Sequence, residues 1–191
     1  MLRPVGGLGR FTIGATDGPI GHVRDVRFRD GRWGVCSLVV EAGRPVLISP
    51  RVLGRIDPER GVLHGCLTRT QVANSPHVDT DRSARSGRDL IGQAVQGLDG
   101  RVGRVADLLL DDRTWRIHHL VVAIDDGGDE RMVSVPVGWV SWVSWEARSV
   151  MVALPADGVR RAPDYDDARP LRAEDDEKIN AHYGPPPFGS L

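Results

Sequence analysis

The sequence is poor in cysteine and has no surplus of positive charge. Cys36 and Cys66 are the two cysteines among 191 residues, and they lack the Cys-X-X-Cys spacing of zinc or redox sites. We therefore expect idle or buried thiols rather than a disulfide framework. The 25 basic residues are balanced by 26 acidic ones, for a net charge of -1. Because binders of duplex nucleic acid carry excess lysine and arginine, nucleic acid is not the expected partner.

Long hydrophobic runs are absent as well. The most apolar segments, around residues 38–40 and 120–124, have the length of a strand, whereas a membrane-spanning helix needs about 20 apolar residues. The sequence therefore predicts no transmembrane segment. The first seven residues contain no apolar core of signal-peptide length, so we expect the chain to stay in the cytoplasm.

Glycine and proline are abundant, with 23 and 13 residues, which favours tight turns and short strands. The chain also repeats itself, because the segments that begin at Asp17 and Asp99 align without a gap. The identical positions are Asp17, Gly18, Gly21, Val23, Asp25, Trp33, Leu38, Val39 and Val40, which fall on Asp99, Gly100, Gly103, Val105, Asp107, Trp115, Leu120, Val121 and Val122. Further along, the expected matches are Ser49 with Ser134, Pro50 with Pro136, and Pro76 with Pro163. Two diverged copies of one module are therefore predicted.

The repeated residues predict short strands joined by tight turns. Asp-Gly at 17–18 and at 99–100 favours a hairpin turn, because glycine accepts a positive φ and aspartate can bond to its own backbone. Gly21 and Gly103 begin strands, which indicates close backbone approach or a bend in a small barrel. The expected strands are 23–28, 45–49 and 61–67, their counterparts 105–110, 131–135 and 149–154, and one more in each copy opened by Trp33 or Trp115. Such a set closes into a small barrel or roll.

The combined pattern resembles the PRC-barrel family. The strings that carry the resemblance are ATDGPIGHVRDVRF, WGVCSLVV, VLISP and LTRTQVANSP in the first half, and DGRVGRVADLLLDD, WRIHHLVV, MVSVP and APDYD in the second. The expected fold class is all-β, with two small PRC-barrel-type β-barrels in tandem and a short C-terminal helix. The expected boundaries are 1–79 for the first barrel, 80–88 for a linker, 89–166 for the second barrel and 167–191 for an acidic helical tail.

The resemblance implies a docking role. In this family the barrel forms the cytoplasmic part of the photosynthetic reaction centre H subunit and part of the ribosome maturation factor, and it is not known as an enzyme fold. We expect a non-enzymatic protein-interaction or scaffold module; an internally duplicated pair imitates a two-fold dimer, so a homodimer stays open. A ribosome- or RNA-associated assembly factor, a peripheral component of a photosynthetic or electron-transfer complex, and a small-ligand binder or enzyme also stay open.

No residue pattern predicts an active site. The histidines at 118–119 point to opposite faces of a strand and lack ligand-spaced partners, so one packed and one solvated ring are expected. Asp25 and Asp107 occupy equivalent strand positions without a consistent acid or base partner, which favours carboxylates that bind turn amides or a neighbouring arginine. Ser49 and Ser134 lack the glycines of a nucleophile elbow. We expect no catalytic residue, cofactor or metal ligand.

Positions that differ between the copies are better candidates for a specific role. The second copy carries Trp139, Trp142 and Trp145 where the alignment gives the first copy Leu53, Ile56 and the region of Glu59. A spacing of three places rings on one side of a helical turn, whereas a strand or loop scatters them. The rings either cover a barrel end or the seam between barrels, or form an exposed patch for a protein partner. Their burial decides between these two interpretations.

The C-terminal tail predicts a helix over residues 171–184. Acidic residues crowd its first turns, Gly184 can cap it, and prolines follow. Leu171, Ile179 and Tyr183 fall at helical spacing on one face, so we expect the helix to dock on a barrel. Ile179 and Tyr183 join the three tryptophans as candidate interaction residues.

Overall fold

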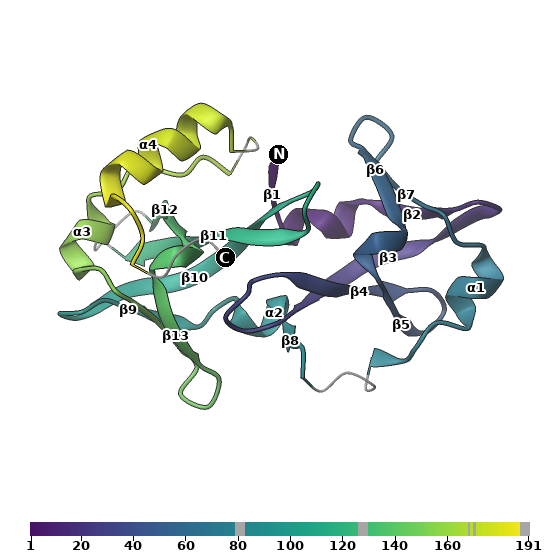
Figure 1. Cartoon of the computed structure of the whole chain (residues 1–191), viewed down its shortest axis with the longest axis horizontal. Helices are drawn as coiled ribbons and strands as arrows, with labels where there is room; N and C mark the ends of the chain where they lie inside the picture. The colour runs from purple at the N-terminus through teal and green to yellow at the C-terminus, as the bar shows by residue number, and fades with distance from the viewer. Residues whose placement is uncertain (79–82, 126–129, 168, 170, 188–191) are drawn as a thin grey trace. The chain divides into compact units, whose positions relative to one another are not determined.

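The computed structural model describes residues 1–78, 83–125, 130–167, 169 and 171–187 (Figure 1). Contacts divide the chain into two compact units. The N-terminal unit comprises Val5–Asp30 and Gly34–Arg88, and the C-terminal unit comprises Met1–Pro4, Gly31–Trp33 and Asp89–Leu191. Residues 80–82 of the predicted linker lie outside the described residues, and residues 85–86 of that linker form a strand.

The N-terminal unit is a seven-stranded sheet with three short helical segments. Its strands are β2 (Thr12–Ala15), β3 (Gly18–Phe28), β4 (Val35–Glu41), β5 (Pro45–Ile48), β6 (Leu53–Asp57), β7 (Val62–Gly65) and β8 (Arg85–Ser86). Its helical segments are η1 (Gly6–Arg10), η2 (Pro50–Val52) and α1 (Arg69–Ala73). The strand order is β5-β4-β3-β2-β7-β6, and β8 pairs with β3.

The C-terminal unit has a sheet of the same order. Its strands are β1 (Leu2–Pro4), β9 (Ala94–Gln96), β10 (Arg101–Asp111), β11 (Arg116–Asp125), β12 (Glu130–Pro136), β13 (Val140–Ser144) and β14 (Ser149–Val152). The helical segments are η4 (Val137–Trp139), α3 (Ala156–Arg160) and α4 (Ala173–Tyr183), and α2 (Gly87–Leu90) spans the boundary between the units. The order β12-β11-β10-β9-β14-β13, with β1 paired to β10, repeats the first sheet strand for strand. The fold class is therefore all-β with a C-terminal helix, as predicted.

The ladder registers correct the sequence alignment of the two copies from β5 and its counterpart β12 onward. Val39 pairs with Leu47, whereas its counterpart Val121 pairs with Ser134. Ser134 is therefore equivalent to Leu47 and not to Ser49. The offset between the copies goes from 82 to 87 across one loop, and the later pairs Leu53–Gly65 and Val140–Val152 keep it. Matching identical letters at Ser and Pro was wrong here, because a strand ladder fixes which residues correspond and a chance identity does not.

Two glycines allow the central strands to cross closely. A Cβ atom on Gly21 would lie 1.7 Å from the carbonyl oxygen of Glu41, and one on Gly103 would lie 2.0 Å from that of Ala123. Each sheet closes over a largely apolar core. The largest fully buried side chains are Phe28, Leu8, Ile13, Leu38, Ile48, Leu63, Leu90, Leu108, Leu109, Leu110, Ile117 and Leu120.

The helix α4 forms where the sequence predicts it and packs within its own unit. Gly184, with φ of 74°, ends it and donates its N–H to the carbonyl of Asn180. Ile179 and Tyr183 are 4% and 9% exposed, and burial of the Ile179 side chain stabilises the fold by about 1.5–3 kcal/mol. Within the part of the chain that the structure describes, no helix has the length and apolar character that crossing a membrane requires.

Candidate protein-docking face

The three tryptophans of the second copy do not form one patch. Trp139 ends η4, Trp142 lies in β13 and Trp145 follows that strand in a turn. Trp139 and Trp145 are half-buried, and the Trp139 Nε1 atom is buried without an acceptor among the described residues. Trp142 is 54% exposed, one of the few large apolar side chains presented to solvent. Trp139 and Trp145 are therefore partly covered by the protein, and Trp142 is the exposed ring of the three.

Trp142 belongs to a group of uncharged residues on one face of the second sheet, and two arginines of β10 border this group, because Arg101 pairs with Gln96 and Arg104 with Ala94. In the ladder Trp142 pairs with Met151, which pairs with Gln96, and side chains of directly paired residues stand on the same face. Ser144, Ser149 and Ala94 form the next row in the same way. We call these six residues the uncharged face: Ala94, Gln96, Trp142, Ser144, Ser149 and Met151.

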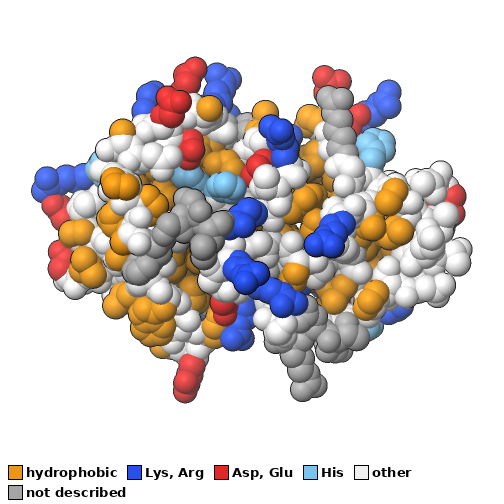
Figure 2. Space-filling model, in the orientation of Figure 1, with side chains coloured by type: hydrophobic (Ala, Val, Ile, Leu, Met, Phe, Trp, Pro, Cys, Tyr) orange, Lys and Arg blue, Asp and Glu red, His pale blue; other side chains and the backbone are white. Residues whose placement is uncertain are grey.

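The uncharged face points outward. Val95, Val150 and Val152, which alternate with its residues along β9 and β14, are fully buried, whereas all six members are half-buried or exposed. Figure 2 shows hydrophobic side chains gathered over the part of the surface where Figure 1 places β13. The rows of β9, β14 and β13 on this face therefore carry no charged side chain, while the exposed Arg101 and Arg104 of β10 stand beside them.

The first repeat provides an internal comparison for the same sheet face. At the structural offsets of 82 and 87, the corresponding residues whose side chains the structure describes are Thr12, Gly14, Asp57, His64 and Val62. An aspartate and a histidine therefore stand where the second repeat has Ser144 and Met151. Because the same strand order forms with an acidic side chain and an imidazole at these positions, the fold itself does not require an uncharged surface there.

The uncharged face borders a strand edge. Among the described residues, β13 lies at the end of the strand order and pairs only with β14. Edge strands are usually protected by lysine, proline, a bulge or shortness. The segment Val140–Ser144 contains no proline or charged residue, although it is short and has a register shift between Val140 and Trp142. Its backbone can therefore accept hydrogen bonds from an added strand.

A buried Ser-His-Asp constellation holds α4 on the second sheet. His119, on β11, is 3% exposed; its Nε2 lies 2.8 Å from Asp176 Oδ1 of α4, and its Nδ1 lies 2.9 Å from Ser134 Oγ. The bonds are satisfied when Ser134 donates to Nδ1 and Nε2–H donates to the carboxylate. Ser134 is 1% exposed, so no substrate reaches this hydroxyl. The constellation is a structural clasp, although its residue types are those of a hydrolase triad.

The electrostatics of the clasp agree with a structural role. The hydrogen bond from His119 lowers the pKa of Asp176 below its ordinary value, against the opposite effect of burial. The neighbouring His118 is exposed, as strand alternation predicts, and partial burial followed by the adjacent His119 lowers its pKa. Ile179 and Tyr183, predicted as candidate interaction residues, are buried by the docked helix and offer no free surface.

The repeated aspartates bind backbone amides. Asp25 Oδ1 accepts hydrogen bonds from the N–H groups of Val26 and Arg88, and its Oδ2 accepts one from Ser86 Oγ. Asp107 accepts the N–H of Leu108 at 2.7 Å. Arg24, a neighbouring arginine, instead pairs with Glu41.

The turn aspartates act at longer range than the sequence suggested. Asp17 accepts the N–H of Arg69 at 2.8 Å, and Asp99 accepts that of Ala156 at 2.6 Å, so each carboxylate satisfies the first residue of a short helix. The glycines that follow, Gly18 and Gly100, have positive φ. Trp33 and Trp115 share a left-handed backbone, with φ of 53° and 54°, and each is 8% exposed.

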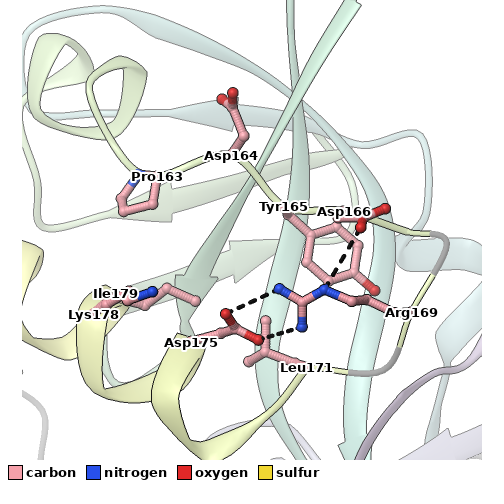
Figure 3. A pocket seen from close by; sticks show the side chains of 9 residues that line it. All are labelled: Pro163, Asp164, Tyr165, Asp166, Arg169, Leu171, Asp175, Lys178 and Ile179. Atoms are coloured by element: carbon pink, nitrogen blue, oxygen red, sulfur yellow. Dashed lines mark hydrogen bonds and ion pairs between the residues drawn. The ribbon is translucent and has the colours of Figure 1, made fainter.

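A small pocket lies between α4 and the segment before it, and Arg169 in its lining forms ion pairs with two aspartates. Arg169 bonds both oxygens of Asp175 at 2.6 and 3.1 Å and lies 3.6 Å from Asp166 (Figure 3). Burial, ahead of nearby carboxylates, raises the pKa of the lining residue Tyr165 to about 12. The cavity measures about 50 Å³, which suits ordered water rather than a substrate.

No metal site forms among the described residues, where no three His, Cys, Asp or Glu side chains gather as ligands. The two cysteines are free; Cys36 is half-buried and Cys66 is exposed.

Residues 83–159 match the PRC-barrel domain. These residues contain all six members of the uncharged face. A search of the curated proteins finds no match to the chain. Among solved structures, the chain is similar to RimM from Pseudomonas aeruginosa, described as a 16S ribosomal RNA processing protein. The two are 17% identical, the match covers 76% of this chain and 96% of that one, and the TM-score is 0.31.

Proposed function

We propose that the chain is a non-enzymatic docking module built from two PRC-barrels, and that it binds a protein partner through the uncharged face of the second barrel. The first sheet is proposed as a diverged PRC-barrel because its strand order and registers match those of the second throughout. The second sheet lies largely within the matched domain.

The observation that carries the proposal is the exposure of Trp142 among the six uncharged residues of this face. Tryptophan is enriched at the centres of protein interfaces, where charged residues are depleted. The same face of the first sheet is polar and includes an exposed histidine, His64. A difference between two copies of one fold points to selection for binding at the second copy. The sealed position of Ser134 supports a role without catalysis.

The test is site-specific photo-crosslinking in the cells that make the protein. A photoreactive phenylalanine analogue replaces Trp142 in one variant and His64, at the corresponding face of the first repeat, in the other. We expect a discrete protein adduct from position 142 and none from position 64. Equal adducts from both positions, or none from 142, would contradict the proposal.

The identity of the adduct separates the remaining functions. A crosslink to another protein supports docking, and its mass spectrum names the partner. An adduct with a second copy of this chain would assign the face to homodimer formation. Crosslinks to RNA in place of protein would favour a ribosome- or RNA-associated role and would overturn the present assignment.

A further inference from the structure

In each unit, one short strand of the sheet comes from the part of the chain that directly precedes the main strands of the other unit. The strand β1 precedes η1 and β2 of the N-terminal unit, yet it pairs with β10. The strand β8 precedes β9, yet it pairs with β3. In the ladders, Arg3 lies opposite Leu110 and Arg85 opposite Phe28. Arg85 follows Arg3 by 82 positions, and Leu110 follows Phe28 by 82 positions, so the two pairings are equivalent in the two repeats.

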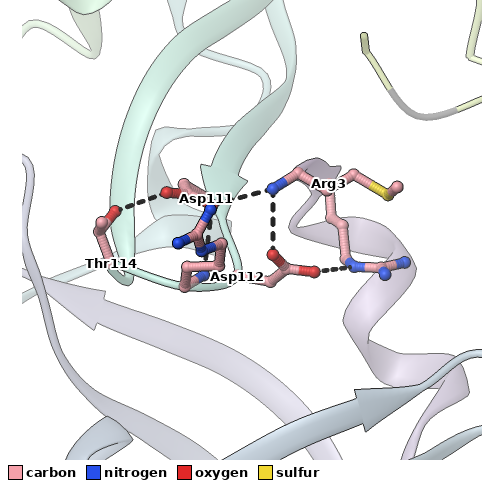
Figure 4. Close-up of polar contacts among 6 residues, drawn as sticks. Arg3, Asp111, Asp112 and Thr114 are labelled. Atoms are coloured by element: carbon pink, nitrogen blue, oxygen red, sulfur yellow. Dashed lines mark hydrogen bonds and ion pairs between the residues drawn. The ribbon is translucent and has the colours of Figure 1, made fainter. Parts of the chain in front are cut away.

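Equivalent ion pairs hold the two strands. Arg3 Nε lies 2.6 Å from Asp112 Oδ2, and the two side chains are only 15% and 13% exposed (Figure 4). Arg85 Nε lies 3.0 Å from Asp30 Oδ2, at the matching place in the other sheet. Partial burial of the first pair strengthens its attraction relative to a fully solvated pair.

The turn before β4 belongs to the same arrangement. Residues Gly31–Trp33 group with the C-terminal unit, although the strands on either side belong to the N-terminal unit. The N–H of Ile117 donates to the carbonyl of Trp33 at 2.8 Å, and Arg116 Nη2 donates to that of Arg32 at 3.0 Å. The matched PRC-barrel domain begins at residue 83, so its own first strand, β8, lies on the other sheet.

We infer that the two repeats form a strand-exchanged pair within one chain and fold as a single cooperative unit. Unfolding of the N-terminal repeat removes β1 and the Gly31–Trp33 turn from the C-terminal sheet. Unfolding of the C-terminal repeat removes β8 from the N-terminal sheet. Each sheet then loses ladder hydrogen bonds and an ion pair, so neither retains its full stability alone. This inference is independent of the docking proposal.

The distribution of tryptophan allows a direct test in the full chain. All five tryptophans lie in the C-terminal unit: Trp33, Trp115, Trp139, Trp142 and Trp145. Four of the five, all except Trp33, also belong to the second repeat, so the main part of the fluorescence change reports on that unit, whereas far-UV circular dichroism reports on both. Leu63→Ala opens a cavity in the N-terminal core, where Leu63 is fully buried. We expect the urea midpoint measured by fluorescence to fall and to coincide with that measured by circular dichroism.

Independent folding predicts a different result. The fluorescence midpoint would stay at the wild-type value while circular dichroism showed an earlier step, and this outcome would overturn the inference. Ile13→Val, a milder change at another buried position of the same unit, gives the same test if Leu63→Ala does not fold. Arg60→Ala is the control, because Arg60 is 81% exposed and its nearest ion pair spans 4.0 Å.

Hydrogen exchange tests the exchange of strands directly. Arg3→Ala should increase exchange in peptides that cover residues 107–112, at the end of β10. Arg85→Ala should increase exchange in peptides that cover residues 25–30, at the end of β3. The effects cross between the repeats. If each substitution instead loosened only the strands that follow it in sequence, β2 or β9, the strand-exchanged pair would be ruled out.

Discussion

Replacing Asp176 by alanine should loosen α4 without affecting the uncharged face. The change removes the acceptor of the Nε2–H of His119, a residue that is 3% exposed. Leaving a buried donor unsatisfied costs about 1–3 kcal/mol. The Asp176 side chain is 39% exposed, so water can reach part of the vacated place. We therefore expect a loss of about 1–2 kcal/mol in the free energy of unfolding.

A double-mutant cycle in urea measures this contribution. The cycle compares wild type, Asp176→Ala, His119→Ala and the double variant, and it should give a coupling energy of about 1–2 kcal/mol. Asp176→Asn keeps an oxygen acceptor and should lose about 0.5 kcal/mol. Glu177→Ala, at an exposed position of the same helix, should stay within about 0.5 kcal/mol of wild type. A coupling energy near zero would refute the clasp.

The clasp also has a defined pH dependence. Because the pKa of Asp176 is lowered in the folded chain, the unfolded chain binds this proton more readily. The stabilisation is therefore present above the ordinary aspartate pKa of about 3.9 and is lost as the pH falls through the lower folded value. The stability difference between wild type and Asp176→Ala should shrink below about pH 4. A difference that grew on acidification would contradict this sign.

Two further changes probe the fold. Gly21→Ala and Gly103→Ala should each destabilise the chain by about 3 kcal/mol or more in urea unfolding, because the new Cβ atom meets backbone atoms. Gly34→Ala is the control and should cost under about 1 kcal/mol, because its Cβ atom would lie in open space. Equal costs at the three positions would contradict the close approach of the strands. Asp99→Ala should cost about 0.5–2 kcal/mol and increase hydrogen exchange at the start of α3, and unchanged exchange there would show that this carboxylate does not cap the helix.

The repeat made much of the fold predictable. A duplicated run of Asp-Gly turns, strand-starting glycines and apolar strands defines two like sheets, and the structure contains them. The close backbone approach at Gly21 and Gly103 could be predicted, because only a residue without a Cβ atom tolerates a carbonyl so near. The helix α4 could also be predicted, since its acidic first turn and its Gly184 cap are local sequence signals.

The remainder depends on contacts distant in sequence. His119 and Asp176 meet across 57 positions, and nothing local marks them as partners. The strand β1 has three residues, too few for a periodic pattern, so its pairing could not be read from composition. The spacing of the tryptophans suggested a common side, but a short 3₁₀ helix, a strand and a turn separate them. Trp142 could be singled out only once β13 was placed.

Binding of a protein partner to the uncharged face is tested most directly by one affinity comparison. The partner captured at position 142 is titrated against wild type and against Trp142→Arg, which replaces the ring by a charged side chain. Trp142 is 54% exposed, so the variant should remain folded. We predict binding weaker by about 30-fold or more, as for a central interface residue worth about 2 kcal/mol. An affinity within about twofold of wild type would contradict docking through this face.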